Sequence, residues 1–168
     1  MTANITADTE TPTFREAMAR FPSGVTIVTT VDEQGRRRGF TASSFCALSM
    51  DPQLVLVCLA TSAECHASFE RAETWLVHIA GMEHEAIARR FATRGADKFA
   101  GDDFTPHSSG LPHLADAPVV LECRAHARYP GGDHTILVGE VVSVGLGEPT
   151  PVVYYDRTFT PAPLSGQN

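Results

Sequence analysis

A run of small hydroxylated residues is the part of the sequence best suited to holding a phosphorylated ligand. It spans residues 39–45 (GFTASSF), and Ser49 follows shortly after. Hydroxyl groups and closely approachable backbone N–H groups are what a phosphate or a ribityl chain requires. The alternative is a Ser/Thr-rich strand on a wet face, which composition alone favours. The run therefore needs support from elsewhere in the chain.

Three further clusters could add polar or planar contacts. Residues 131–134 (GGDH) are predicted at a hairpin tip, where loops on a rigid sheet often carry function. Lys98, in the DKF segment at 97–99, could pair with a phosphate or simply with the neighbouring Asp97. The YYDR segment at 154–157 brings two tyrosines that could flank a planar ring or lie half-buried in a strand. Each cluster has a functional and a structural interpretation at this point.

Several catalytic motifs are excluded by single residues. The HE pair at 84–85 begins a zinc-protease motif, but Ala88 occupies the position of its second histidine. The segment around Ser109 lacks the leading glycine of a nucleophile elbow. The GLGEP segment at 145–149 lacks the third glycine of a Rossmann dinucleotide loop. No CxxC pair occurs among the four cysteines, so no metal site is predicted.

Mostly β-strands are predicted to position these clusters. A short helix opens at Thr13, with Glu16 completing a capping box, and ends at Pro22. The segment 54–59 (LVLVCL) is apolar at every position, which predicts a strand buried on both faces. Other predicted strands cover 25–31, 37–48, 74–80, 119–126, 135–144 and 152–155, and two more helices cover 64–71 and 83–92.

This order of elements predicts a mainly β fold with a few short helices. About seven strands joined mostly by hairpins leave too few helices for parallel crossovers, so an antiparallel barrel, closed or split, is expected. A chain of 168 residues has room for one domain. We place it at residues 13–159, between flexible tails at 1–12 and 160–168, which are rich in Thr, Pro, Ser and Gly.

Composition excludes several classes of partner. The chain carries 13 basic and 20 acidic residues, a net charge of −7, so binding to nucleic acid or to an anionic membrane is not expected. The N-terminus lacks the pattern of a secretion signal, and no apolar run is long enough to span a bilayer. We expect a cytoplasmic protein whose cysteines are reduced.

Taken in order, the clusters resemble the short-chain flavin reductase family, the NAD(P)H-dependent suppliers of reduced flavin to two-component monooxygenases. Residues 39–99 are particularly similar to the FMN:NADH reductases of the actinorhodin type. The segments that carry the resemblance lie between residues 13 and 159, at 14–18, 20–29, 39–45, 48–54, 97–99, 132–141 and 154–155. One departure is the loop at 61–63 (TSA), where several relatives carry Asn or Lys.

The resemblance implies a six-stranded Greek-key split barrel that forms a homodimer and binds FMN, or else FAD, near the subunit interface. Its flavin-binding residues would be Thr41, Ala42, Ser43, Ser44, Ser49, Cys58, Leu59, Ala60, Ser62, Lys98 and Phe99. By the same resemblance His134 would contact the nicotinamide of NADH or NADPH. The rest of the dinucleotide site would be shaped by Phe21, Pro22, Tyr154, Tyr155 and Arg157.

Hydride transfer between nicotinamide and flavin needs close stacking of the two rings and no general base. We therefore expect His134 to position the nicotinamide rather than to act as an acid or base. Reduced flavin would then diffuse to a monooxygenase. The alternatives are a non-catalytic flavin-binding sensor or carrier on the same barrel, and a barrel oxidase acting on a pyridoxine-type phosphate.

Overall fold

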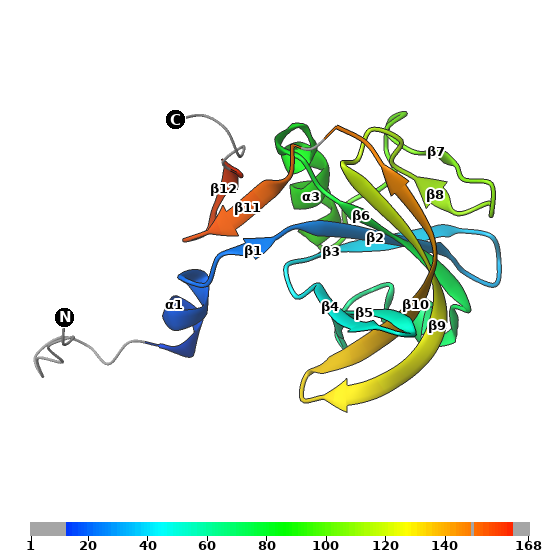
Figure 1. Cartoon of the computed structure of the whole chain (residues 1–168), viewed down its shortest axis with the longest axis horizontal. Coiled ribbons are helices and arrows are strands. Elements are labelled where there is room, and N and C mark those ends of the chain that lie inside the picture. Colours follow the sequence, from blue (N-terminus) through cyan, green and yellow to red (C-terminus); the bar gives the residue numbers. More distant parts are fainter. Residues whose placement is uncertain (1–12, 149, 163–168) are drawn as a thin grey trace, which may run out of the picture.

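Seven antiparallel strands form the main sheet of the computed structural model, which describes residues 13–148 and 150–162 (Figure 1). Its first and last strands in sheet order, β3 and β4, are consecutive in the chain, so the curled sheet brings its two edges together at residues 43–45. The prediction of a mainly β, antiparallel fold is confirmed. In sheet order the strands are β3 (Arg37–Ala42), β2 (Thr26–Val31), β6 (Thr74–Ile79), β9 (Val119–Gly131), β10 (His134–Leu146), β5 (Gln53–Ala60) and β4 (Cys46–Met50).

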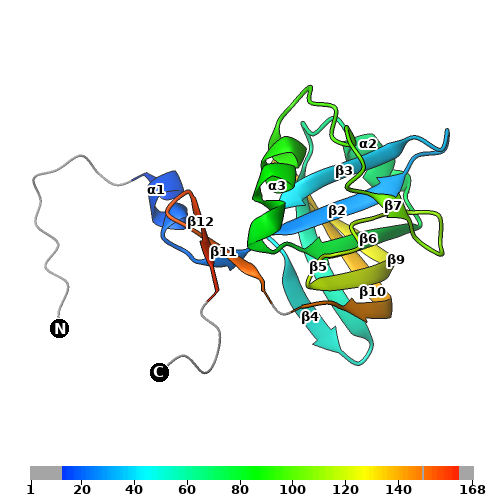
Figure 2. The ribbon, with the colours of Figure 1, turned by 90° about the horizontal axis from the view of Figure 1, so that it is seen from above.

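A smaller unit, which we call the arm, stands beside this sheet (Figures 1 and 2). The N–H of Val152 donates to the carbonyl of Ala80 at 3.0 Å, and the N–H of Ala80 donates to Val25 at 2.9 Å, so backbone hydrogen bonds join the arm to the sheet. The arm consists of helix α1 (Phe14–Ala19) and the three-stranded sheet of β1 (Ser23–Gly24), β11 (Val152–Tyr155) and β12 (Thr158–Pro161).

The remaining elements cover the main sheet. Figure 2 shows α3 next to β3. Helix α3 packs on the outer face of the sheet, whereas α2 contributes Phe69 to the inside of the curled sheet. No described helix is long and apolar enough to cross a membrane. These elements are helices α2 (His66–Arg71) and α3 (Glu85–Ala92), the 3-10 turn η1 (Met82–His84) and the small hairpin of β7 (Thr105–Pro106) and β8 (Pro112–His113).

The boundaries of several elements differ from the predictions. The capping box at Thr13 is confirmed: its hydroxyl accepts the N–H of Glu16 at 3.2 Å, and the Glu16 carboxylate accepts the N–H of Thr13 at 2.7 Å. The strand predicted over 37–48 is broken at 43–45 into β3 and β4. Strand β12 extends to Pro161, so the domain boundary predicted at residue 159 falls two residues too early. Residues 1–12 and 163–168, predicted as tails, lie outside the described residues.

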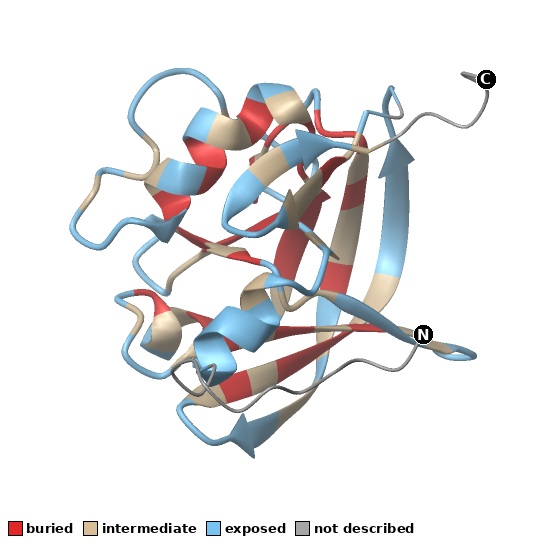
Figure 3. Cartoon of the chain, turned by 90° about the vertical axis from the view of Figure 1, so that its left-hand side faces the viewer, coloured by how far each residue is buried: buried red, intermediate tan, exposed pale blue. Residues whose placement is uncertain are grey.

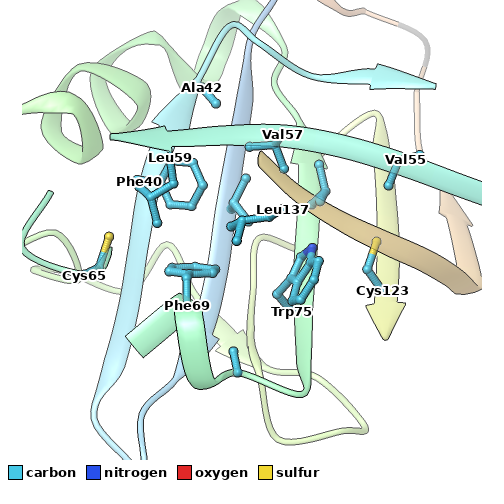
Figure 4. Packing of buried hydrophobic residues seen from close by; sticks show 13 residues of the cluster. Phe40, Ala42, Val55, Val57, Leu59, Cys65, Phe69, Trp75, Cys123 and Leu137 are labelled. Carbon is cyan, nitrogen blue, oxygen red and sulfur yellow. The ribbon is translucent and has the colours of Figure 1, made fainter. Parts of the chain in front are cut away.

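Two clusters of buried residues lie on opposite sides of β2 and β6. The first fills the inside of the curled sheet, where Phe40 and Phe69 meet edge to face at 4.9 Å and Trp75 is fully buried (Figure 4). The second packs between the outer face of these strands and α3, and it includes Ile87 and Phe91 of that helix, as predicted. Strands β2 and β6 are therefore the strands buried on both faces.

Strand β5 was predicted to be buried on both faces, and this is wrong. Its inward residues, such as Val57 and Leu59, are buried, but Leu54, Leu56 and Cys58 on the other face are only partly covered. The reason is that no other described element packs against the outer face of β5 and β4 (Figure 3). An apolar run shows that both faces of a strand could be buried. It does not show that other elements of the same chain cover both faces.

A buried imidazole links the segment after β8 to the main sheet. His78 is fully buried in β6; its Nδ1–H donates to the carbonyl of Ile27 at 2.9 Å, and its Nε2 accepts the N–H of Leu114 at 3.2 Å. These two bonds require a neutral ring, and burial lowers the pKa of His78 to about 3.

The packing around Trp75 predicts the cost of one added methyl group. A Cβ at Gly139 would lie 2.8 Å from both Cys123 Cβ and Trp75 Cζ2, whereas one at Gly145 on the same strand would be 3.7 Å from its nearest neighbour, Val120. Gly139→Ala should lower the free energy of unfolding by about 1–3 kcal/mol because the core is already full. Gly145→Ala should change it by less than about 0.5 kcal/mol. Urea unfolding followed by Trp75 fluorescence checks both, and equal effects would contradict the packing argument.

Candidate functional site

One cavity, called here the main cavity, has a volume of about 370 Å³ and is lined by six of the eleven predicted flavin-binding residues and by His134. It lies where β3, the end of β5, α3 and the β9–β10 turn meet. Seven of the predicted residues line it: Thr41, Cys58, Leu59, Ala60, Ser62, Lys98 and His134. The other lining residues, none of which was predicted as a site residue, are Gly39, Phe40, Ala63, Glu64, Cys65, Phe91, Ala92 and Arg94.

One wall of the main cavity is an open strand edge. The ladder between β4 and β5 stops at the pair Cys46 and Leu56. Beyond it the Ser44 hydroxyl takes the place of a strand: it accepts the N–H of Cys58 at 3.0 Å and donates to its carbonyl at 3.3 Å. Alternate residues of a strand direct their N–H groups to the same side, so the N–H of Ala60 also faces this open edge.

The same alternation corrects one expectation. Both Leu59 and Ala60 were expected to offer backbone N–H groups to a ligand. The N–H of Leu59 faces β10, where Leu59 pairs with Thr135, and its side chain is buried in the core. Ala60 alone therefore provides a strand-edge donor at this end of β5.

A hairpin turn holds His134 at the mouth of the main cavity. Gly132 has a φ of +70°, which the two-residue turn between β9 and β10 requires. The N–H and hydroxyl of Thr61 both donate to the carbonyl of Asp133, at 2.9 and 3.1 Å, so the loop after β5 is tied to this turn. The His134 ring donates from Nδ1 to the Asp133 carboxylate at 2.7 Å, and its side chain is 42% exposed.

Two loops cross-link at the rim. Arg94 donates to the carbonyl of Ser62 at 3.3 Å, and the Glu64 carboxylate accepts the N–H of Gly95 at 3.0 Å. The described side chains that line the cavity include two cations, Arg94 and Lys98, and one carboxylate, Glu64. The lining therefore carries a small excess of positive charge. This charge suits an anionic ligand.

Lys98 and Phe99 have structural contacts that their sequence positions did not reveal. The Lys98 ammonium donates to the carbonyls of Phe91 at 2.7 Å and Thr93 at 3.0 Å, so it caps the end of α3. One of its three N–H bonds remains for a ligand. Phe99 lies outside the main cavity and packs edge to face on Phe91, with ring centroids 5.0 Å apart.

The remaining residues of the hydroxylated run have diverse placements. The Thr41 hydroxyl donates to the carbonyl of Ala88 at 2.6 Å and joins β3 to α3. The side chain of Ala42 points into the core, and that of Ser43 is exposed. Ser49 pairs with Leu54, four residues before Cys58, which places it about 13 Å along β5 from the cavity.

The residues expected to shape the dinucleotide site are not next to His134 in one protomer. Phe21 and Pro22 follow α1, and Tyr155 and Arg157 lie at the β11–β12 turn. All four belong to the arm, which Figure 1 shows well separated from the β9–β10 tip. Tyr154 also belongs to the arm, where its ring packs against Phe159 of β12.

Residues that sequence reasoning missed depend on long-range contacts. Gly39 is required because a Cβ there would lie 2.6 Å from the Phe91 ring and 2.8 Å from the Val28 carbonyl. Its place at the head of the hydroxylated run was the only local signal. Arg94, Glu64 and Thr61 gain their roles from partners more than 30 residues away, which no local pattern identifies.

A second cavity, of about 270 Å³, lies over the β2–β3 turn and is less suited to catalysis. Its charged side chains largely pair with one another: Asp32 binds Arg36 at 2.8 Å and Arg38 at 3.0 Å. Within residues 13–148 and 150–162, no three His, Cys, Asp or Glu side chains gather as metal ligands would.

The contact between His134 and Asp133 predicts a change in acidity. The pKa of Asp133 is lowered chiefly by the hydrogen bond from His134. His134→Ala should therefore raise the pKa of Asp133 toward the ordinary carboxyl value, as measured by carbon-13 NMR against pH. The internal control is Asp32, whose pKa is about 2 because, despite burial, it accepts hydrogen bonds from Arg36 and Arg38. An unchanged Asp133 would show that the two side chains do not interact in solution.

Two curated proteins are similar to this chain over most of its length. The chain is 44% identical over 156 residues to the NADH:riboflavin 5′-phosphate oxidoreductase of Streptomyces pristinaespiralis, covering 90% of this chain and 89% of that protein. It is 48% identical over 146 residues to actinorhodin polyketide dimerase of Streptomyces coelicolor, covering 86% of this chain and 82% of that protein.

A solved structure extends the likeness to the fold. The styrene monooxygenase flavin reductase of Pseudomonas putida S12 matches with a TM-score of 0.80 and 28% identity, over 90% of this chain and 99% of that one. The model of the family described as flavin reductase like domain matches residues 18–163, almost the whole described chain. The resemblance inferred from the ordered clusters is thereby confirmed, and the protein belongs to the flavin reductase like domain family.

Proposed function

We propose that the protein is an NADH-dependent flavin reductase that transfers a hydride to FMN and supplies the reduced flavin to a separate monooxygenase. The observation that carries the proposal is the main cavity, where the open edge of β5 and the His134 side chain meet. Two relatives support it by name, one as an NADH:riboflavin 5′-phosphate oxidoreductase and one as the flavin reductase of a monooxygenase. FAD and NADPH are the alternatives to FMN and NADH.

The lining of the main cavity fits a flat ring system. Small residues such as Gly39, Ala60, Ala63 and Ala92 leave its walls open. Flavin and reduced nicotinamide, when bound, supply the hydride chemistry between them. The protein's part is to orient them and exclude water: the N–H of Ala60 would donate to a ring edge where negative charge gathers.

His134 would act as a positioning residue toward the nicotinamide. Its Nδ1–H is already given to Asp133, so in the neutral ring Nε2 is left as an acceptor. It would therefore accept an N–H of the nicotinamide carboxamide, rather than donate to its oxygen. Asp133 would fix the orientation of the ring from behind.

The flavin side chain would be held by residues 41–44, Ser62 and Lys98. Because the hydroxyls of Thr41 and Ser44 already bond the protein, their contribution would come from backbone N–H groups. Neighbouring strand residues direct their N–H groups to opposite sides, so only one of Thr41 and Ala42 would offer an N–H group, and the other faces β2. Ser43 and Ser62 have exposed side chains, and Lys98 would give its remaining N–H to the phosphate. Ser49 and Phe99 would act only indirectly in the same protomer.

Steady-state kinetics on flavin-free protein test the function and the role of His134. Wild type should oxidise NADH only when flavin is added, with FMN, FAD and riboflavin compared. His134→Ala should raise KM for NADH about tenfold, the effect of one lost hydrogen bond, with FMN affinity within about twofold. His126→Ala, an exposed histidine of β9, is the matched control.

Two outcomes would contradict these assignments. A collapse of FMN affinity in His134→Ala with an unchanged KM for NADH would place His134 in the flavin site. Wild type that binds flavin without consuming NADH or NADPH would favour the non-catalytic module.

We infer that the protein works as a homodimer. Helix α1 buries none of its residues, although Phe14 and Met18 lie one turn apart and are 80% and 51% exposed (Figure 3). On the uncovered outer face of β4 and β5, Cys46 is exposed and its partner Leu56 is only partly covered. A second copy would cover these surfaces and could bring its arm, with Phe21, Tyr155 and Arg157, to the His134 of the first.

Removing the apolar stripe of α1 tests this inference. Phe14→Ser with Met18→Ser should weaken dimerisation at least about 100-fold, because two large apolar side chains per protomer would no longer be buried. The control is Arg15→Ser with Ala17→Ser, which also places two serines on α1 but removes no large apolar side chain. Sedimentation velocity over a dilution series measures both, and a wild type that is monomeric at micromolar concentration would refute the dimer.

We further infer a six-stranded split barrel in which β3 and β4 count as one bent strand. The sheet order supports this count, because these two strands are its edges and are consecutive in the chain. We also propose a cytoplasmic location. All four cysteines are free, and free thiols are typical of a reducing compartment.

A further inference from the structure

The ladder between β5 and β10 ends at the main cavity with the pair Ala60 and His134. Residues directly opposite each other in an antiparallel ladder carry their side chains on the same face of the sheet. Under the proposed function, the N–H of Ala60 meets the flavin and the His134 ring meets the nicotinamide. The geometry of this one pair therefore sets how the two ligands lie relative to each other.

Thr61 fastens the chain just beyond this pair. Its N–H donates to the carbonyl of Asp133 at 2.9 Å, and its hydroxyl donates to the same carbonyl at 3.1 Å. The carboxylate of Asp133 accepts the Nδ1–H of His134 at 2.7 Å. Asp133 is thus held by Thr61 through its backbone, and it holds the His134 ring through its side chain.

The second bond to the Asp133 carbonyl restrains the residue that orients the ring. A carbonyl oxygen accepts two hydrogen bonds, and Thr61 supplies both. The peptide group that carries this oxygen therefore rotates only if two bonds break. The restraint matters because the side chains of His134 and Asp133 are 42% and 92% exposed, so water competes for the bond between them.

The packing of the fold does not require the Thr61 hydroxyl. Thr61 is exposed and belongs to neither cluster of buried residues. Replacement of an exposed side chain of this kind has little effect on stability. The hydroxyl therefore serves the turn that carries His134 rather than the core.

We propose that Thr61 is a positioning residue for the hydride transfer, which acts through Asp133 to hold the His134 ring in place beside the flavin-binding edge of β5. The proposal rests on the proposed function for the identity of the two ligands. Thr61 itself touches neither ligand, because its N–H and its hydroxyl are both used within the protein.

A matched pair of substitutions at Thr61 tests the proposal. Thr61→Val removes the hydroxyl and keeps the N–H and the branched shape, whereas Thr61→Ser keeps the hydroxyl. With saturating FMN, Thr61→Val should raise KM for NADH about fivefold, the effect of one neutral hydrogen bond, and leave FMN affinity within about twofold. Thr61→Ser should restore the wild-type KM. Thr105→Val, at an exposed threonine of β7, is the control and should change neither value.

A double-mutant cycle shows whether Thr61 acts through His134. If it does, Thr61→Val should have no further effect on KM for NADH in a protein that already carries His134→Ala. The melting temperature of Thr61→Val should stay within about 2 °C of wild type, which separates positioning from loss of the fold.

Carbon-13 NMR of Asp133 against pH provides a measurement without turnover. The hydrogen bond from His134 is the main cause that lowers the pKa of Asp133. Thr61→Val in flavin-free protein should move this pKa part of the way toward the value found in His134→Ala. Thr61→Ser should leave it at the wild-type value.

Three results would overturn the proposal. They are an unchanged KM for NADH in Thr61→Val, an equally large effect of Thr61→Val in the presence and absence of His134, and a loss of FMN affinity as large as the loss for NADH. Failure of the proposed function gives a different result: no added flavin supports NADH oxidation by wild type, while Thr61→Val still shifts the pKa of Asp133.

Discussion

The double hydrogen bond between the Ser44 hydroxyl and the backbone of Cys58 is the constraint on which the site depends. A sheet that closed by a regular ladder would use every N–H of β5. Here one side chain stands in for a strand, so the chain can turn between β3 and β4, and the edge of β5 beyond Cys58 stays free. Closure of the sheet and exposure of an unpaired strand edge beside the main cavity therefore have the same origin.

Around this edge the site is assembled from loops that are far apart in the sequence. Thr61 ties the loop after β5 to the turn that carries His134, and Arg94 and Glu64 tie that same loop to the end of α3. These bonds fix the rim through backbone groups, so the side chains can be small. A reaction that takes place between two cofactors needs this kind of rigid, shaped enclosure more than it needs acids or bases.

Local patterns predicted what local interactions determine. The capping box of α1, the hairpin of β2 and β3 and the long hairpin of β9 and β10 all depend on neighbours in the chain or on a turn, and all are present. The break at 43–45 was not predicted, because it follows from a contact between Ser44 and a strand 14 residues away.

The site was predicted less completely for the same reason. Lys98 was expected to pair with a phosphate or with its neighbour Asp97, whereas its partners in the structure are the last carbonyls of α3. The apolar run of β5 indicated two buried faces, but one chain covers only one of them. The tyrosines of β11 were grouped with His134 by their order in the family pattern, and only the arm's position shows that they are separate in one protomer.

The neutral imidazole of His78 has a consequence for acid tolerance. The unfolded chain takes up a proton there near pH 6.5, whereas the folded chain does so only near pH 3, so this contribution to stability is complete above pH 6.5 and is lost as acidity rises toward pH 3. The stretch that includes Leu114 would then be released, since protonation of Nε2 removes its acceptor. A single proton, taken up near pH 3, would therefore detach this stretch from β6.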